Sequence, residues 1–98
     1  YKPLNLTLEW EQARVIYLRW KGNPTPYESA SPIDHFRLRW SKGPEYTRWD
    51  SRKLPPTEFG PYQIKNMDTH RWYRFEVVAI NSLGIYSEPS DPIFYFVI

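Results

Sequence analysis

The sequence predicts an all-β fold, a seven-stranded antiparallel β-sandwich, from its length, its prolines and the period of its apolar residues. The chain has 98 residues and a mass of 11.9 kDa, which suits one domain over residues 1–98. Its 10 prolines leave almost no window long enough for a helix. Between the prolines, apolar residues recur at every second position, as in strands with one buried face.

The period-two pattern places the strands in chain order. Alternation is clear at 4–8, 16–20, 36–40 and 72–79, and Trp10 extends the first of these runs, so we expect it to cap the sandwich. A fourth strand is expected at 46–49 and a fifth at 62–65, and the stretch 22–32 has the composition of a loop. The last strand, 93–98, is apolar on both faces. We expect it to pair with the sixth strand, its outward face covered by a partner, a neighbouring domain or long side chains.

Composition excludes several classes of function. Without cysteine there can be no disulfide scaffold, thiolate zinc site or cysteine nucleophile. A net charge of +2 is too small for a nucleic-acid binder that acts by bulk charge. No apolar run approaches the ~18 residues of a membrane span, so we expect a module of a longer protein that lies outside the membrane itself.

The residues of the sixth strand carry a resemblance that covers the whole chain. Met67 is followed six residues later by Tyr73, and then come apolar residues at every second position and the Asn81–Gly84 turn. Upstream, Trp20 lies in an apolar alternation, and Ser87 precedes Pro89 near the last strand. In this order the motifs resemble the fibronectin type III family, which has an immunoglobulin-like sandwich fold.

The resemblance implies roles for two aromatic residues, one in the core and one in a tyrosine corner between the sheets. Trp20 would be the core tryptophan of the second strand, and Tyr73 would send its hydroxyl back to the main chain near 67–69. The sequence departs from the family at two places, where Thr69 replaces a proline and Arg71 a threonine. The Arg-Gly-Asp tripeptide that binds integrins in some members is absent.

The outward positions of the third and sixth strands combine arginine with tryptophan. In the family these two strands are neighbours, so an arginine can stack on an outward tryptophan, worth ~0.5–1 kcal/mol when exposed. The cations expected to flank this face are Arg48, Arg52, Lys53 and Arg71. One interpretation is that these residues form cross-strand pairs exposed to solvent. The other is that they form a contact surface for a partner. The candidate partner-binding residues are Arg37, Arg39, Trp72 and Arg74. Because tryptophan and arginine are enriched at interface hot spots, a protein partner is favoured over an acidic glycan such as heparan sulphate.

Other chemistry has little support. His35 and His70 stand in different segments without spaced metal ligands, and no catalytic motif is evident. We therefore expect no enzyme, no metal site and no cofactor. Asn5-Leu6-Thr7 is a glycosylation sequon, which makes Asn5 a candidate site and favours an extracellular or cell-surface location.

The family resemblance implies a non-catalytic recognition and spacer module in a multidomain, membrane-anchored receptor or adhesion protein. Two alternatives remain open. The stretch 86–90, Tyr-Ser-Glu-Pro-Ser, matches the two serines of the Trp-Ser-x-Trp-Ser motif in cytokine receptors, so a ligand-binding domain of that type is one. The other is an intracellular structural repeat.

Overall fold

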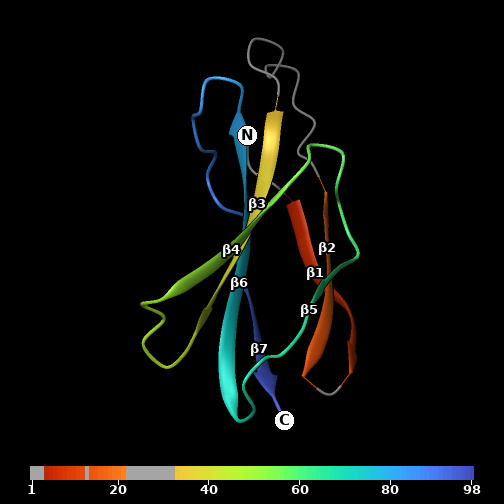
Figure 1. Cartoon of the computed structure of the whole chain (residues 1–98), viewed down its shortest axis with the longest axis vertical. Helices are drawn as coiled ribbons and strands as arrows, with labels where there is room; N and C mark the ends of the chain where they lie inside the picture. Colours follow the sequence, from red (N-terminus) through yellow and green to blue (C-terminus); the bar gives the residue numbers. More distant parts are fainter. Residues whose placement is uncertain (1–3, 13, 22–32) are drawn as a thin grey trace.

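The computed structural model describes residues 4–12, 14–21 and 33–98. The loop predicted at 22–32 and the start of the chain at 1–3 lie outside these residues. The described residues form seven strands (Figure 1), the number that the period-two pattern predicts. Among them, no helix is long and apolar enough to cross a bilayer.

The strands differ in length, from three residues to eleven. In chain order they are β1 (Leu4–Gln12), β2 (Val15–Lys21), β3 (Ile33–Lys42), β4 (Trp49–Leu54), β5 (Tyr62–Ile64), β6 (Arg71–Asn81) and β7 (Ile93–Val97). All the pairings between them are antiparallel.

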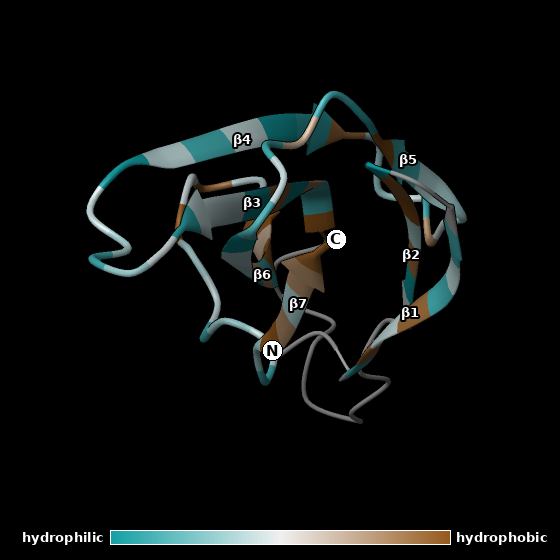
Figure 2. Cartoon of the chain, turned by 90° about the horizontal axis from the view of Figure 1, so that it is seen from below, coloured by the Kyte–Doolittle hydropathy of each residue, from teal (hydrophilic) through white to brown (hydrophobic). Residues whose placement is uncertain are grey.

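Two sheets pack face to face. One has the order β1-β2-β5 and the other β4-β3-β6-β7, and the view along the strands shows the two layers (Figure 2). The alternating residues of both sheets meet between the layers. The largest side chains there with less than 2 % exposure are Trp20, Phe36, Phe75, Ile16, Leu18 and Leu38. Burial of each such side chain contributes ~1.5–3 kcal/mol, so aromatic and aliphatic volume holds the sheets together.

A tyrosine corner joins the sheets, as the family resemblance implies. The Tyr73 hydroxyl accepts a hydrogen bond from the Asp68 amide at 2.8 Å, and both Met67 and Tyr73 are buried. The bond forms although Thr69 replaces the family's proline, because its donor is the main chain one residue earlier. It fixes the chain that crosses from β5 to β6.

The fourth strand begins three residues later than predicted. Tyr46 has a φ of 54°, in the left-handed region, and lies in the loop between the turn at 43–45 and β4. β4 therefore runs from Trp49, opposite Ser41, to Leu54, opposite Phe36. This register decides which of its side chains face outward.

The expectation that Trp10 caps the sandwich is wrong. The pairing of β1 with β2 shifts between Leu8 and Trp10, and this irregularity turns the indole away from the core. Trp10 is 53 % exposed and its ring lies against Tyr17, with ring centroids 5.1 Å apart.

β6 is buried on both faces over part of its length, although the alternation predicts one solvent face. Glu76, Val78 and Ile80 are all buried on the outward side. β6 is an interior strand, with β3 on one side and β7 on the other. Before β7 begins, Ser87 and Ser90 continue beside β6, and their hydroxyls accept from the amides of Ala79 and Val77.

Candidate functional site

The outward face of the four-stranded sheet gathers side chains from all four strands. Register places Arg39 of β3 between Ser51 of β4 and Glu76 of β6. One row away, Arg74 of β6 lies opposite Phe94 of β7, and Trp72 lies opposite Phe96. Directly paired residues share a face of a sheet. The candidate residues Arg37, Arg39, Trp72 and Arg74 therefore all point to one side, as predicted.

Aromatic rings from β4, β6, β7 and the β3–β4 connection gather on this side. The Trp72 and Phe96 rings are 5.4 Å apart, and Tyr46 meets Phe94 edge-on at 5.9 Å. The exposed fractions are 51 % for Trp72, 51 % for Phe94, 43 % for Trp49 and 36 % for Phe96. We call these four residues together with Tyr46 the outer aromatic face. Several large exposed apolar side chains on one face of a sheet are typical of interaction sites.

A buried carboxylate holds two arginines among these rings. Glu76 Oε1 accepts from Arg39 Nε at 2.6 Å, and Glu76 Oε2 lies 3.5 Å from Arg74 Nη2. The Glu76 side chain is only 5 % exposed. Each arginine also lies over a ring, Arg39 over Trp49 at 5.6 Å and Arg74 over Phe94 at 5.7 Å. Both guanidinium groups are thus positioned before any partner binds.

The predicted stacking of an arginine on Trp72 is wrong. The tryptophan beneath an arginine is Trp49, because the register of β4 brings it to the same side as Arg39, whereas Trp72 lies against Phe96. Glu76, expected in solvent, is buried between the two arginines.

The flanking cations divide between the two sides of the sheet. Lys53 lies opposite Arg37 and shares the outward face, whereas Arg52 lies opposite the buried Leu38 and does not. Arg48, also expected there, lines a pocket beside Trp40.

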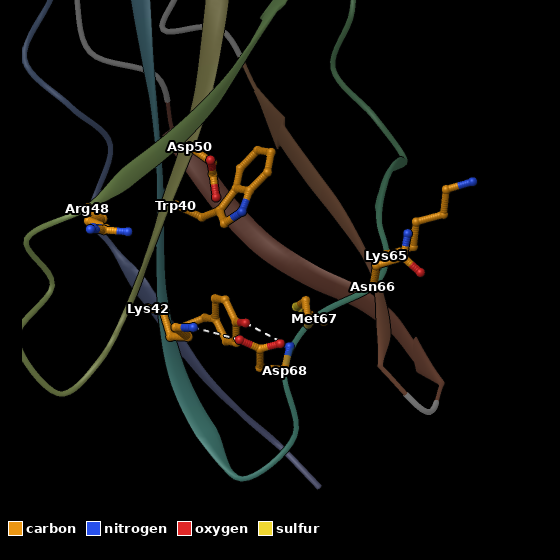
Figure 3. Close-up of a pocket in the computed structure, with 9 residues that line it drawn as sticks. Trp40, Lys42, Arg48, Asp50, Lys65, Asn66, Met67 and Asp68 are labelled. Carbon is orange, nitrogen blue, oxygen red and sulfur yellow. Dashed lines mark hydrogen bonds and ion pairs between the residues drawn. The ribbon is translucent and has the colours of Figure 1, made fainter.

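That pocket lies under the tyrosine corner and has a volume of about 420 Å³ (Figure 3). Met67, Tyr73 and Trp40 contribute apolar surface, and charged side chains of both signs surround it. Lys42 Nζ donates to Asp68 Oδ2 at 2.6 Å across it. This hydrogen bond and the charge of Lys42 lower the pKa of Asp68 below the ordinary 3.8. Charges of both signs give the pocket no clear preference for a ligand.

The histidine and carboxylate side chains of the described residues form no metal site. No group of three or more His, Asp or Glu side chains among them could hold a metal ion. His35 Nδ1 is 2.7 Å from Asp34 Oδ2 and His70 lies against Phe96, so the two histidines serve different local contacts.

The candidate glycosylation residue Asn5 is exposed on β1, in the three-stranded sheet. Its φ is 54°, at an irregular point in the pairing with β2, and Thr7 of the same sequon is exposed too. Asn5 therefore belongs to the other sheet from the outer aromatic face.

Sequence reasoning did not assign Tyr46, Trp49, Phe94 and Phe96 to the site. The apolar run at 93–98 pointed to an outward apolar face on the last strand, and that signal identified β7 correctly. Trp49 could not be assigned, because its side of the sheet depends on where β4 begins.

The comparisons with known proteins agree with the fold. The model of the fibronectin type III domain matches residues 1–96. Three similar solved structures are a two-domain fibronectin type III segment of chicken tenascin, chicken CNTN1 domains FN1–FN3, and the twitchin kinase region from C. elegans. Their sequence identities to this chain are 18 %, 17 % and 18 %, with TM-scores of 0.77, 0.77 and 0.72. The matches cover 98 %, 97 % and 97 % of this chain but only 49 %, 31 % and 15 % of those chains.

Proposed function

Because the chain belongs to the fibronectin type III family, we propose that it is a non-catalytic recognition and spacer module of a multidomain cell-surface receptor or adhesion protein. Members of this family are generally structural or binding modules. The similar segments of chicken tenascin and CNTN1 each contain more than one such domain, which supports a place within a longer array. A single domain over residues 1–98 would then be one unit of that array.

The outer aromatic face is the observation that carries the proposed recognition. Trp72 and Phe94 are each 51 % exposed although the core between the sheets is filled by other aromatic residues. Tryptophan and arginine dominate the binding energy of protein interfaces, and here they alternate in one surface. A protein partner that covers this face removes its rings from water and contacts arginines that are already in place.

An extracellular location would put Asn5 within reach of the glycosylation machinery. Asn5 and Thr7 are both exposed, and β1 is in the sheet that faces away from the outer aromatic face. A glycan there leaves the proposed contact surface clear. When the full-length parent protein is expressed with its own leader, we expect a glycosidase-sensitive mass that Asn5→Gln removes. An unmodified Asn5 in that protein would favour the intracellular alternative, to which the twitchin likeness corresponds.

A binding screen tests the recognition function. The purified domain is assayed against a panel of secreted and cell-surface ectodomains, and every positive is measured with Trp72→Ala and Trp10→Ala. Loss of a central aromatic anchor costs at least ~2 kcal/mol, so we expect about 30-fold weaker binding with Trp72→Ala. Trp10 has a similar exposure on the other sheet and is the matched control. A partner that tolerates Trp72→Ala and is lost with Trp10→Ala contradicts the proposal.

One observation favours a second candidate, a ligand-binding domain of cytokine-receptor type. Ser87 and Ser90, the serines that match that family's motif, donate their amides to the carbonyls of Ala79 and Val77, both at 2.8 Å. The aromatic rings that lie beneath Arg39 and Arg74 do not belong to this serine-containing stretch. They are Trp49 of β4 and Phe94 of β7. If the ligand is bound by the turn after β6, Leu83→Ser will abolish binding and Trp72→Ala will leave it intact.

A further inference from the structure

The outward face of the four-stranded sheet has a marked excess of positive charge. Its described strands place four cations there, namely Arg37, Arg39, Lys53 and Arg74. Glu76 is the carboxylate on the same side, and it is already engaged by two of them. The side chains that these strands place on the outward face therefore carry a formal excess of three positive charges beside the outer aromatic face.

The arginines also have hydrogen-bonding capacity left. Arg39 uses Nε for Glu76, and Arg37 uses Nη1 for Ser51 Oγ at 3.0 Å. Their remaining Nη donors meet no acceptor in the described chain. Arginine presents up to five donors in a planar fork that fits a carboxylate with two parallel bonds. The side chains of Arg39 and Arg74 are 32 % and 37 % exposed, so a carboxylate from outside can reach them.

From this charge and ring pattern we propose that the partner's contact segment is acidic and carries large apolar side chains. The inference rests on the proposed recognition function and names the class of partner. Carboxylates of the segment pair with Arg37, Lys53 and the free donors of Arg39, while its apolar side chains pack on Trp72 and Phe94. Complementary charge of this kind selects the partner and speeds its association.

Two other occupants fit less well. A second copy of this chain would bring two positive faces together, and like charges repel. A sulphated glycan would pair with the cations. Its polar chain would offer no apolar side chains to the four rings, each of which is 36–51 % exposed. A protein segment satisfies both the charges and the rings.

A peptide selection tests the class of partner. A random 12-residue phage library is selected on the domain, and the enriched peptides are synthesised. We expect them to be net acidic with at least one aromatic or leucine residue. Their binding should weaken about 30-fold with Trp72→Ala. It should weaken by roughly three- to tenfold with Arg37→Glu or Lys53→Glu. Arg52→Glu makes the same charge change on the other side of β4 and should stay within about twofold.

The outcomes separate this inference from the proposed function. If the selected peptides are neutral or basic but their binding still depends on Trp72, the partner segment is not acidic, and only the proposed recognition function remains supported. If no peptide distinguishes wild type from Trp72→Ala, both fail. A heparin dodecasaccharide, measured in parallel, should bind weakly and lose its binding in high salt. If heparin binds more tightly than every peptide and depends on Arg37 and Lys53, the partner is a glycan.

Discussion

Replacing Glu76 by glutamine removes the carboxylate that holds two arginines in place. Oε1 accepts from Arg39 at 2.6 Å and Oε2 faces Arg74 at 3.5 Å. A glutamine of the same shape can still accept from Arg39 through its carbonyl oxygen. Its NH₂ group then faces the NH₂ donor of Arg74. The substitution thus removes one charge-assisted contact and the negative charge between two guanidinium groups.

The size of the effect follows from burial. A hydrogen bond to a charged group contributes ~1.5–3 kcal/mol, and breaking a fully buried ion pair costs ~3–5 kcal/mol. Arg39 and Arg74 are about one third exposed, so water screens them and the lower range applies. We expect Glu76→Gln to reduce the free energy of unfolding by about 1–3 kcal/mol. In a domain of this size each kcal/mol lowers Tm by ~4–8 °C.

Urea and thermal unfolding, followed by tryptophan fluorescence and circular dichroism, measure this change. Glu88→Gln is the matched control, because the Glu88 side chain is exposed and forms no ion pair with any described residue. The control should stay within ~0.5 kcal/mol of wild type. If Glu76→Gln lowers the free energy of unfolding no more than Glu88→Gln does, the carboxylate does not hold the arginines in place, and this would refute the prediction.

Three further predictions concern the tyrosine corner, a tight glycine and the ion pair at the pocket. Tyr73→Phe should cost ~1–3 kcal/mol in urea unfolding, because it leaves the amide of residue 68 without its acceptor, and a neutral result means water reaches that amide. At Gly60 (φ 96°) a Cβ would come within 2.4 Å of a main-chain carbonyl oxygen, whereas at Gly84 (φ 81°) nothing lies within 4 Å. Gly60→Ala should therefore lower the free energy of unfolding clearly more than Gly84→Ala. Equal losses of stability would contradict this packing. The pKa of Asp68 is lowered by Lys42, so its stabilising contribution is present above the ordinary 3.8 and is lost as the pH falls through the lowered value. An NMR titration should find that pKa higher in Lys42→Met than in wild type, and an unchanged pKa would show that the pair does not form in solution.

Local sequence patterns together with the family resemblance predicted the fold. Alternation along each strand identifies the core around Trp20, and the resemblance of the Met67–Tyr73 spacing to the family pattern implied the corner. These features repeat within a few residues, so a single sequence displays them. Alternation put Arg37 and Arg39 on one face of the third strand and Trp72 and Arg74 on one face of the sixth. The family resemblance implied that these two strands are neighbours, and the pairing of β3 with β6 confirms it.

Details of the site depend on contacts between distant residues, which the sequence does not display. Glu76 is buried because Arg39, 37 residues earlier, reaches it from the neighbouring strand. Trp49 reaches this face because β4 begins at residue 49 and pairs it with Ser41 of β3. A shift of one residue would have placed Trp49 on the opposite side.

The central claim is that the outer aromatic face is the recognition surface, and the five tryptophans report on it directly. Trp49 and Trp72 lie on that face, Trp10 on the other sheet, Trp20 in the core and Trp40 beside the pocket. In an NMR titration with the partner found by the ectodomain screen, each indole N–H gives its own signal. We predict that the signals of Trp49 and Trp72 move and that the other three stay. Movement of Trp10 or Trp40 with Trp49 and Trp72 unchanged would contradict the claim.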